Sequence, residues 1–234
     1  MPNSKDAERA LASYSSPKQA ANLSRFFKTA PGQYGEGDKF IGVTTPQQRL
    51  VANQLYKELS LPAIASLLHS PIHEYRSTAL LMLVKRYEKG GKEEKQRIFQ
   101  LYLKNLRFIN NWDLVDLSAP NIVGAHLQNR SKRLIFQFSR SKSLFTRRIS
   151  IVSTYFFIKH KSYKETLAIS KILLEDKHDL IHKAVGWMLR EVGKRNQEAE
   201  EKFLRLHCKK MPRTMLRYAI ERFSDEKKRK YMAT

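Results

Sequence analysis

The amino-acid sequence predicts an all-α fold in which two-helix units stack in a row. Three observations lead to this prediction. Apolar residues recur at helical spacing along most of the chain, as at Leu80, Leu83, Val84 and Tyr87. Alternating apolar and polar residues, which would indicate strands, are almost absent. A similar short segment also returns about every 35 residues, a spacing typical of stacked helical repeats.

The prolines and glycines predict where several helices begin and end. Ser16-Pro17, Thr45-Pro46 and Ser70-Pro71 each combine a capping side chain with a proline suited to the first helical turn. Gly90-Gly91 predicts the end of a helix. We therefore expect about a dozen helices joined by short turns.

The repeat is defined by four similar segments, each with a basic residue at the same slot: Arg76, Arg148, Lys183 and Arg217. Arg76 and Arg148 are 72 residues apart, about twice the spacing of 35 and 34 residues between the later segments. The midpoint between Arg76 and Arg148 is Trp112. Equivalent slots of stacked helices lie side by side, so these five residues should form a row on one face. One turn later the positions are Leu80, Asp116, Val152, Trp187 and Glu221. The spacing predicts a right-handed αα solenoid of HEAT-like repeats with a basic concave face.

The composition describes a folded and strongly basic chain. Its 234 residues contain 44 Lys and Arg against 22 Asp and Glu, which gives a net charge of +22. This excess favours a polyanionic partner, and an apolar fraction of 41% argues against disorder. We expect a single domain over residues 1–234, with a frayed N-terminal helix in residues 1–15 and a basic C-terminal end in residues 225–234.

Other sequence features concern compartment and cofactors. The single Cys208 excludes a disulfide framework and fits a reducing compartment. No apolar run is long enough to span a membrane or to act as a signal peptide, so we expect a cytoplasmic protein without a membrane partner. No phosphate-binding glycine motif is present, and His178 and His182 lack an acidic ligand in register. We therefore expect no metal and no cofactor.

Trp112 and Asp116 carry the clearest chemical signal. They stand four residues apart, so they project side by side from one helix face. A carboxylate on a surface that binds phosphate is unfavourable for binding alone, but it would stabilise an oxocarbenium-like sugar formed when a cationic purine leaves. Tryptophan faces attract such cations. The alternatives are that Asp116 pairs with Arg148 or another residue of the basic row as a structural contact, and that each tryptophan packs in the core.

Three segments together resemble the AlkD family of alkylpurine DNA glycosylases. They are Asn110-Asn111-Trp112-Asp113-Leu114-Val115-Asp116, Arg147-Arg148-Ile149-Ser150-Ile151-Val152, and Lys183-Ala184-Val185-Gly186-Trp187-Met188-Leu189-Arg190-Glu191. The resemblance covers residues 15–225. It implies an enzyme that excises N3- or N7-alkylated purines from duplex DNA. Since an open concave groove can work as a monomer, we also expect a monomer without an obligate protein partner. It also implies that Asp116 is the catalytic carboxylate, that Trp112 and Trp187 frame the lesion, and that Arg148 and Arg190 contact DNA.

The sequence departs from the family pattern near the N-terminus. Phe27 stands where the family has Tyr, and Thr44 stands where it has Gln; both positions belong to the predicted DNA-binding set with Arg76, Lys183 and Arg217. These changes bear on lesion range and affinity. The loop at residues 30–39 is longer than in the family and contains three glycines. It serves either as a plain connector or as a flap that senses the minor groove.

Two other function classes remain open on the sequence. The first is a non-enzymatic HEAT-repeat module that binds damaged DNA or an acidic protein, which would tolerate substitution of Asp116. The second is an RNA-binding helical repeat, although the chain lacks the polar code that such repeats use for single bases.

Overall fold

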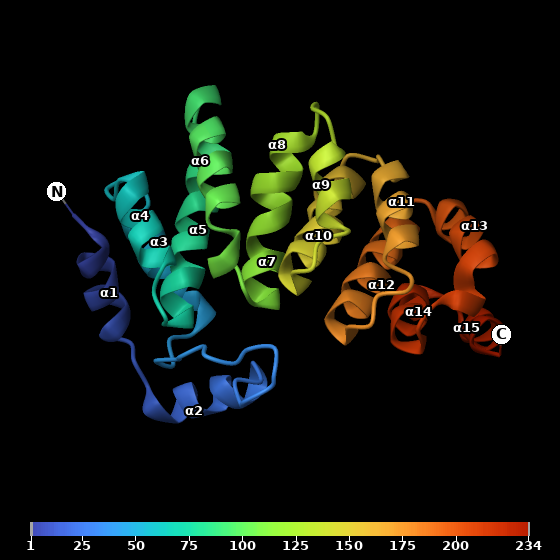
Figure 1. The fold of residues 1–234 in the computed structure, drawn as a ribbon, viewed down its shortest axis with the longest axis horizontal. Helices are drawn as coiled ribbons and strands as arrows, with labels where there is room; N and C mark the ends of the chain where they lie inside the picture. The colour runs from blue at the N-terminus through green and yellow to red at the C-terminus, as the bar shows by residue number, and fades with distance from the viewer. Residues whose placement is uncertain (1, 234) are drawn as a thin grey trace. The chain divides into compact units, whose positions relative to one another are not determined.

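The computed structural model describes residues 2–233 and contains helices and turns but no strand in that range. The all-α prediction is confirmed (Figure 1). One isolated bridge joins Lys39 to Ile72. By the pattern of internal contacts the chain divides into two compact units, Met1–Ser118 and Ala119–Thr234. The single domain and the basic concave face, both of which concern the whole chain, stay predictions.

Unit 1 is built from helices that pack against one another around α5. α5 packs against α3, α4 and α6, and α1 packs against α3 and α4. A short 3-10 turn at Leu106–Phe108 precedes the last helix. The helices are α1 (Ser4–Ala12), α2 (Pro17–Phe26), α3 (Thr45–Leu55), α4 (Leu61–Leu68), α5 (His73–Lys89), α6 (Lys92–Lys104) and α7 (Trp112–Ala119), whose last residue begins unit 2.

Unit 2 is also built from helices that pack against their neighbours. α10 packs against α9, α11 and α12, and α12 packs against α11, α13 and α14. A π-helical turn, η2 (Pro120–Gly124), packs against α10. The helices are α8 (Ala125–Leu127), α9 (Arg133–Phe138), α10 (Leu144–Lys159), α11 (Lys164–Ile172), α12 (Asp179–Gly193), α13 (Gln197–His207), α14 (Arg213–Ala219) and α15 (Asp225–Met232), with 3-10 turns at Cys208–Lys210 and Ile220–Arg222.

The predicted repeat register agrees with this helix pairing. The five slot residues lie on α5, α7, α10, α12 and α14, the second helices of five successive pairs. Close packing of neighbouring second helices depends on Gly186, because a Cβ there would lie 2.4 Å from the carbonyl oxygen of Met215 on α14. A side chain at this position would therefore push α12 and α14 apart.

Some predicted helix starts are correct and one is wrong. Ser16 caps α2 by accepting a hydrogen bond from the N–H of Gln19, whereas α3 begins one residue earlier than predicted, after Thr44. Ser70-Pro71 does not begin a helix. Pro71 instead accepts a backbone hydrogen bond from Lys39, the N–H of His73 donates to the Lys39 carbonyl, and α5 starts at His73.

The two ends of the described chain are both helical. Asn3 and Asp6 form a capping box on α1, and Ala7 and Leu11 are fully buried, so α1 is anchored rather than frayed. At the other end, α15 is capped by Ser224, and its Lys227 pairs with Glu201 of α13 at 2.5 Å.

Helix α2 differs from the rest of unit 1. It contains no buried residue, and it lies apart from the other helices of the unit (Figure 1). The segment after it returns through Gly42, whose φ of +84° is in the left-handed region. A Cβ on Gly42 would lie 2.1 Å from the carbonyl oxygen of Ser16, so this glycine lets the returning chain pass directly beneath the start of α2.

Candidate functional site

Trp112 and Asp116 lie on α7 as predicted, one helical turn apart, and both side chains are half-buried. The ring of Trp112 stacks on Phe27, with centroids 5.4 Å apart and planes 22° apart, and meets the ring of Phe26 edge-on at 5.9 Å. Phe26 is 63% exposed. The indole is therefore held on one side by α2 residues while part of it remains open to solvent.

Phe27 connects the ring of Trp112 to buried aromatic residues of the core. It is 7% exposed, stacks on Phe40 at 5.1 Å, and lies 4.8 Å from the ring of His73. Its position supports Trp112 from behind. Thr44 is exposed at the start of α3, where its backbone N–H and its hydroxyl both donate to Oε1 of Gln47. Of these two predicted site residues, only Phe27 contacts Trp112.

Behind the aromatic stack, His73 lies between two carboxylates. Its Nδ1 is 3.0 Å from Asp38 and its Nε2 is 2.8 Å from Asp113, and its side chain is 2% exposed. Burial alone would lower the pKa of His73, but the charge of Asp113 and the hydrogen bonds to both carboxylates raise it to about 9. At neutral pH His73 is therefore a buried imidazolium that donates from both nitrogens.

Asp38 is hydrogen-bonded to two further polar side chains beside His73. It accepts hydrogen bonds from Arg76 at 2.5 Å and from Asn111 at 3.0 Å in addition to His73. Burial would raise its pKa, but the hydrogen bond from His73 and the charge of Arg76 lower it below the ordinary value. We call Asp38, His73, Arg76, Asn111 and Asp113 the buried ion network.

The buried ion network changes the interpretation of Arg76. The sequence placed this residue in an exposed basic row, but its side chain is 4% exposed and bonds to Asp38 and to the carbonyl oxygen of Ser70. The physical reason is that Asp38 supplies the counterion that allows an arginine to be buried. We therefore do not carry Arg76 forward as a DNA contact.

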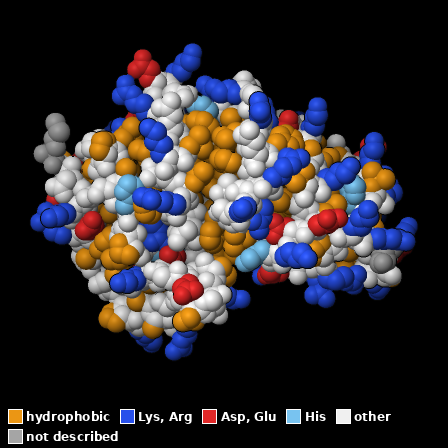
Figure 2. Space-filling model, viewed as in Figure 1, with side chains coloured by type: hydrophobic (Ala, Val, Ile, Leu, Met, Phe, Trp, Pro, Cys, Tyr) orange, Lys and Arg blue, Asp and Glu red, His pale blue; other side chains and the backbone are white. Residues whose placement is uncertain are grey.

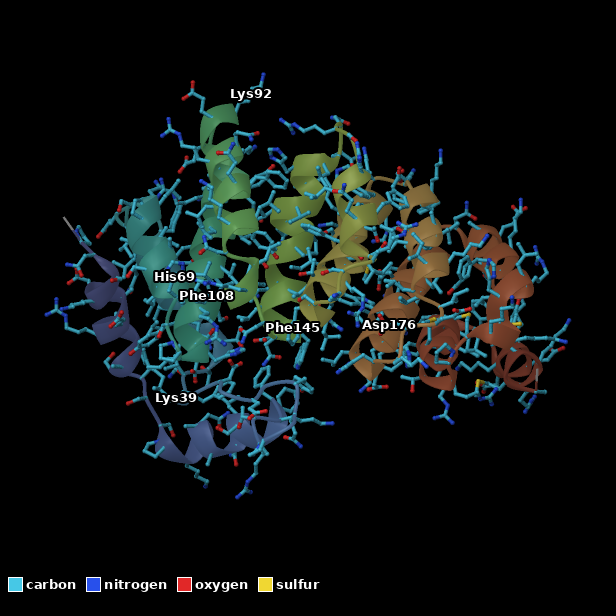
Figure 3. The ribbon with its side chains drawn as sticks, in the orientation of Figure 1. Lys39, His69, Lys92, Phe108, Phe145 and Asp176 are labelled. Carbon is cyan, nitrogen blue, oxygen red and sulfur yellow. The ribbon has the colours of Figure 1, made fainter. Side chains whose placement is uncertain are left out.

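The loop at residues 30–39 has a definite role in this arrangement. Gly35 is buried, and its N–H donates to the carbonyl oxygen of Lys28. The N–H of Lys39 donates to the carbonyl oxygen of Pro71, and the carbonyl oxygen of Lys39 accepts from the N–H of His73. Lys39 lies on the segment below α5 (Figure 3). These contacts fix both sides of Asp38. In this structure the loop delivers a buried carboxylate to His73 and is more than a plain connector.

Asp116 lies on the same helix as Asp113 but in different surroundings. Complete burial raises the pKa of Tyr102, and the negative charge of Asp116 raises it further. The Tyr102 hydroxyl is hydrogen-bonded to Ser118 at 3.0 Å. Asp113, on the same helix, accepts a hydrogen bond from His73.

In unit 2, Trp187 lies on α12 beside an aromatic and cationic group. Its ring is 5.8 Å from that of Tyr155 on α10. Lys159 and Arg195 both lie over the Tyr155 ring, at 5.3 and 6.0 Å from its centroid. Trp187 is half-buried, and Lys159 and Arg195 are exposed. This mixture of flat rings and cations suits a nucleic-acid surface.

The other predicted basic residues of unit 2 differ in exposure. Arg217 is exposed on α14. Lys183 is half-buried and pairs with Asp179 at 2.7 Å. Arg148 is 5% exposed and donates to the carbonyl oxygen of Leu180, and Arg190 pairs with Glu221. Lys and Arg side chains far outnumber acidic ones on the face in view (Figure 2).

The sequence did not single out His73, Asp38, Phe26 or Tyr155. His73 stands three residues before the repeat slot at Arg76, so it shares that helix face and could have been found from the register. Asp38 lies in a glycine-rich loop with no periodic signal. Among the described residues, no group of three or more His, Cys, Asp or Glu side chains could hold a metal ion.

Comparison with known proteins agrees with these features. The family model described as "DNA alkylation repair enzyme" matches residues 7–223. The chain belongs to this family. A solved structure, the predicted DNA alkylation repair enzyme from Enterococcus faecalis, has the same fold: the TM-score is 0.70 and the identity 18%, over 90% of this chain and 97% of that one. No curated protein sequence gives a significant match.

Membership of the DNA alkylation repair enzyme family implies a role in DNA repair and in DNA binding. It suggests an enzyme rather than a passive module. Within the described residues, no helix is long and apolar enough to cross a membrane.

Proposed function

We propose that this DNA alkylation repair protein is a DNA glycosylase of the AlkD type, which hydrolyses the N-glycosidic bond of N3- or N7-alkylated purines in duplex DNA. The observation that carries the proposal is the placement of Trp112 and Asp116 one turn apart on α7, both half-buried, in a chain of net charge +22. A negative group in this position opposes DNA binding, so its value lies in the reaction.

The proposed reaction needs one carboxylate. The bond between the sugar C1′ and the purine nitrogen breaks, and its electron pair neutralises the positive charge of the alkylated base. Asp116 stabilises the positive charge that develops on the sugar. A water molecule then bonds to C1′ and gives up a proton to Asp116 or to solvent. Because a cationic base leaves without protonation, the mechanism requires no general acid, metal or cofactor.

The remaining residues of the proposal hold the DNA. Trp112 lies against the alkylated nucleotide, where its face attracts the positive charge of the base, and Trp187 offers a second aromatic face to DNA. Lys183, Arg190 and Arg217 contact phosphates. Arg148 is 5% exposed and bonds to the Leu180 carbonyl, so, like Arg76, it is not carried forward as a DNA contact. Phe27 supports Trp112 by stacking against its ring. Thr44 lies at the edge of the surface that contacts DNA. We propose that the protein acts as a cytoplasmic monomer on alkylated duplex DNA and without an obligate protein partner.

The test is release of the base from methylated duplex DNA by native protein and by Asp116→Asn. We expect the variant to excise the base about 10²–10³-fold more slowly and to bind DNA at least as tightly, because a repulsive charge is gone. Asp225→Asn removes an acidic charge from an 86% exposed side chain and is the matched control, with unchanged excision expected. Tight binding of damaged DNA without base release by the native protein would instead support a non-enzymatic damage-binding module.

A further inference from the structure

Helix α2 has no buried residue, yet the backbone holds it at both ends. At its start, the N–H of Ser16 donates to the carbonyl oxygen of Ile41 at 2.8 Å, and Gly42 allows this close approach of the two segments. At its end, the N–H of Gly35 donates to the carbonyl oxygen of Lys28 at 3.1 Å. A helix that is exposed and already fixed loses little conformational entropy when it binds a partner.

One face of α2 is exposed from the first turn to the last. Its residues recur at helical spacing, and the other residues of the helix are half-buried. Lysine, arginine and asparagine, which contact the phosphates and sugars of DNA, alternate on this face with small and aromatic residues. The exposed residues are Pro17, Lys18, Ala21, Asn22, Arg25 and Phe26.

The cations of α2 and of the residue that follows its last turn have no acidic partner. Residues 9–35 contain four cations and no Asp or Glu. Among the described residues, no ion pair involves Lys18, Arg25 or Lys28, and all three are exposed. A phosphate backbone would supply the negative charge that this segment lacks.

Phe26 lies where this cationic face meets the candidate site. Its ring is 5.9 Å from that of Trp112 and meets it edge-on, and 63% of the residue is exposed. Phe27, the next residue, points inward and is 7% exposed. Two aromatic rings with open surface, Phe26 and Trp112, therefore lie next to each other, and such rings pack against nucleotides in many nucleic-acid surfaces.

We propose that α2 is a DNA-binding arm of unit 1, in which Lys18, Arg25 and Lys28 contact phosphates and Phe26 packs against the nucleotide next to the alkylated one. The place given to Phe26 rests on the proposed function, because the alkylated nucleotide lies against Trp112. Contact between the three cations and duplex DNA depends only on their charge and exposure. Phe26 holds the substrate and takes no part in the bond changes.

The first measurement is the salt dependence of binding of the full-length protein to an undamaged duplex. Each lost phosphate contact should lower the slope of log K against log[salt] by about 0.9. Lys18→Ala, Arg25→Ala and Lys28→Gly should each do so. Lys28 has a φ of +54°, which glycine adopts readily, so Lys28→Gly should keep the native denaturation midpoint.

Lys92→Ala is the matched control for these charges. Lys92 is exposed at the start of α6, at the end of unit 1 away from Lys39 (Figure 3). The variant loses one cation as the others do, and its slope should equal that of the native protein.

The second measurement concerns Phe26. Phe26→Ala should weaken binding to duplex DNA about 5-fold and raise the KM for excision by a similar factor, with kcat and the salt slope nearly unchanged. Phe26→Tyr keeps the ring and should behave as the native protein does. Leu206→Ala is the control, because Leu206 is 69% exposed on α13, a helix without a proposed DNA contact. It should bind DNA normally.

The proposal is overturned if the variants of Lys18, Arg25 and Lys28 keep the native slope, or if Phe26→Ala binds duplex DNA as tightly as the native protein. An equal loss of affinity for a polyglutamate peptide in the same variants would assign the face to an acidic protein instead. Excision by native protein, together with unchanged slopes for the α2 variants, removes only this proposal. Slopes that fall as expected in a protein that releases no base remove only the glycosylase proposal.

Discussion

The two units differ in how each holds one buried acidic side chain, Asp38 in unit 1 and Glu200 in unit 2. Unit 1 buries a set of ionised groups that are paired with one another, and His73 is held between two carboxylates. Unit 2 buries Glu200, which is 1% exposed and whose Oε1 has no hydrogen-bond partner. The comparison teaches that a carboxyl group can be buried in two ways. Asp38 has cationic partners and a lowered pKa, whereas Glu200 has a raised pKa and an oxygen without a hydrogen-bond partner.

The largest expected effect concerns the buried ion network. Replacing His73 with Ala would leave two buried carboxylates without their shared partner, and we expect the free energy of unfolding at pH 7 to fall by about 3–5 kcal/mol. Denaturant titration measures this change. The exposed His160 provides the control, and His160→Ala should have little effect.

The same network predicts a pH dependence. The pKa of His73 is raised from 6.5 to about 9 in the folded state. Its stabilising contribution is therefore complete below pH 6.5 and is lost as the pH rises through 9. Native protein should become less stable over this range, and His73→Ala should lack that part of the decline. An identical pH profile for both proteins would show that His73 is not held as an imidazolium.

A smaller effect of similar origin is expected at Glu200. Burial, together with the charge of Glu201, raises the pKa of Glu200 from 4.5 to about 8. The folded state therefore holds a proton that the unfolded state loses, and stability decreases as the pH rises from 4.5 through 8. Glu200→Gln keeps a neutral side chain at every pH. It should raise the free energy of unfolding at pH 9 by about 1–3 kcal/mol.

The control for Glu200 is Glu198→Gln, an exposed position on the same helix. It should leave the pH profile of stability unchanged. If Glu200→Gln instead lowered stability at pH 9, then Glu200 would be ionised and paired, and the contrast between the two units would disappear.

The smallest expected effect concerns the outward charge of unit 2. Arg217→Ala should lower the slope of log K against log[salt] for duplex DNA by about 0.9, the value for one lost phosphate contact. Damaged and undamaged DNA should be affected alike. Arg97→Ala on α6 removes a cation whose side chain is 70% exposed, and it should leave the slope unchanged. An unchanged slope for Arg217→Ala would place Arg217 outside the DNA contact.

The helical architecture and the pairing of helices could be predicted from the sequence because both depend on local periodicity. Trp112 and Asp116 were predicted on one helix face for the same reason. Arg76 was misplaced, since its slot in the repeat says nothing of the acid that pairs with it. Asp38 reaches Arg76 only through a loop with no periodic pattern, so no spacing in the sequence could predict the contact.

The sequence also did not indicate the aromatic stack behind Trp112, in which Phe27 contacts Phe40 and His73 from other segments of the chain. Phe27 and Thr44 were expected at the DNA surface from the family pattern. Only the structure shows that Phe27 contacts Trp112, whereas Thr44 bonds to Gln47.

The buried ion network also has a consequence for the time course of folding. Neighbouring helices in a stack close short loops, and such local contacts form quickly. Asp38, by contrast, must meet His73, which is 35 residues away, and Asn111, which is 73 residues away. Closing these longer loops costs more chain entropy. We therefore expect unit 2 to reach its native contacts first, and the meeting of Asp38 with its partners to be the late event that completes unit 1.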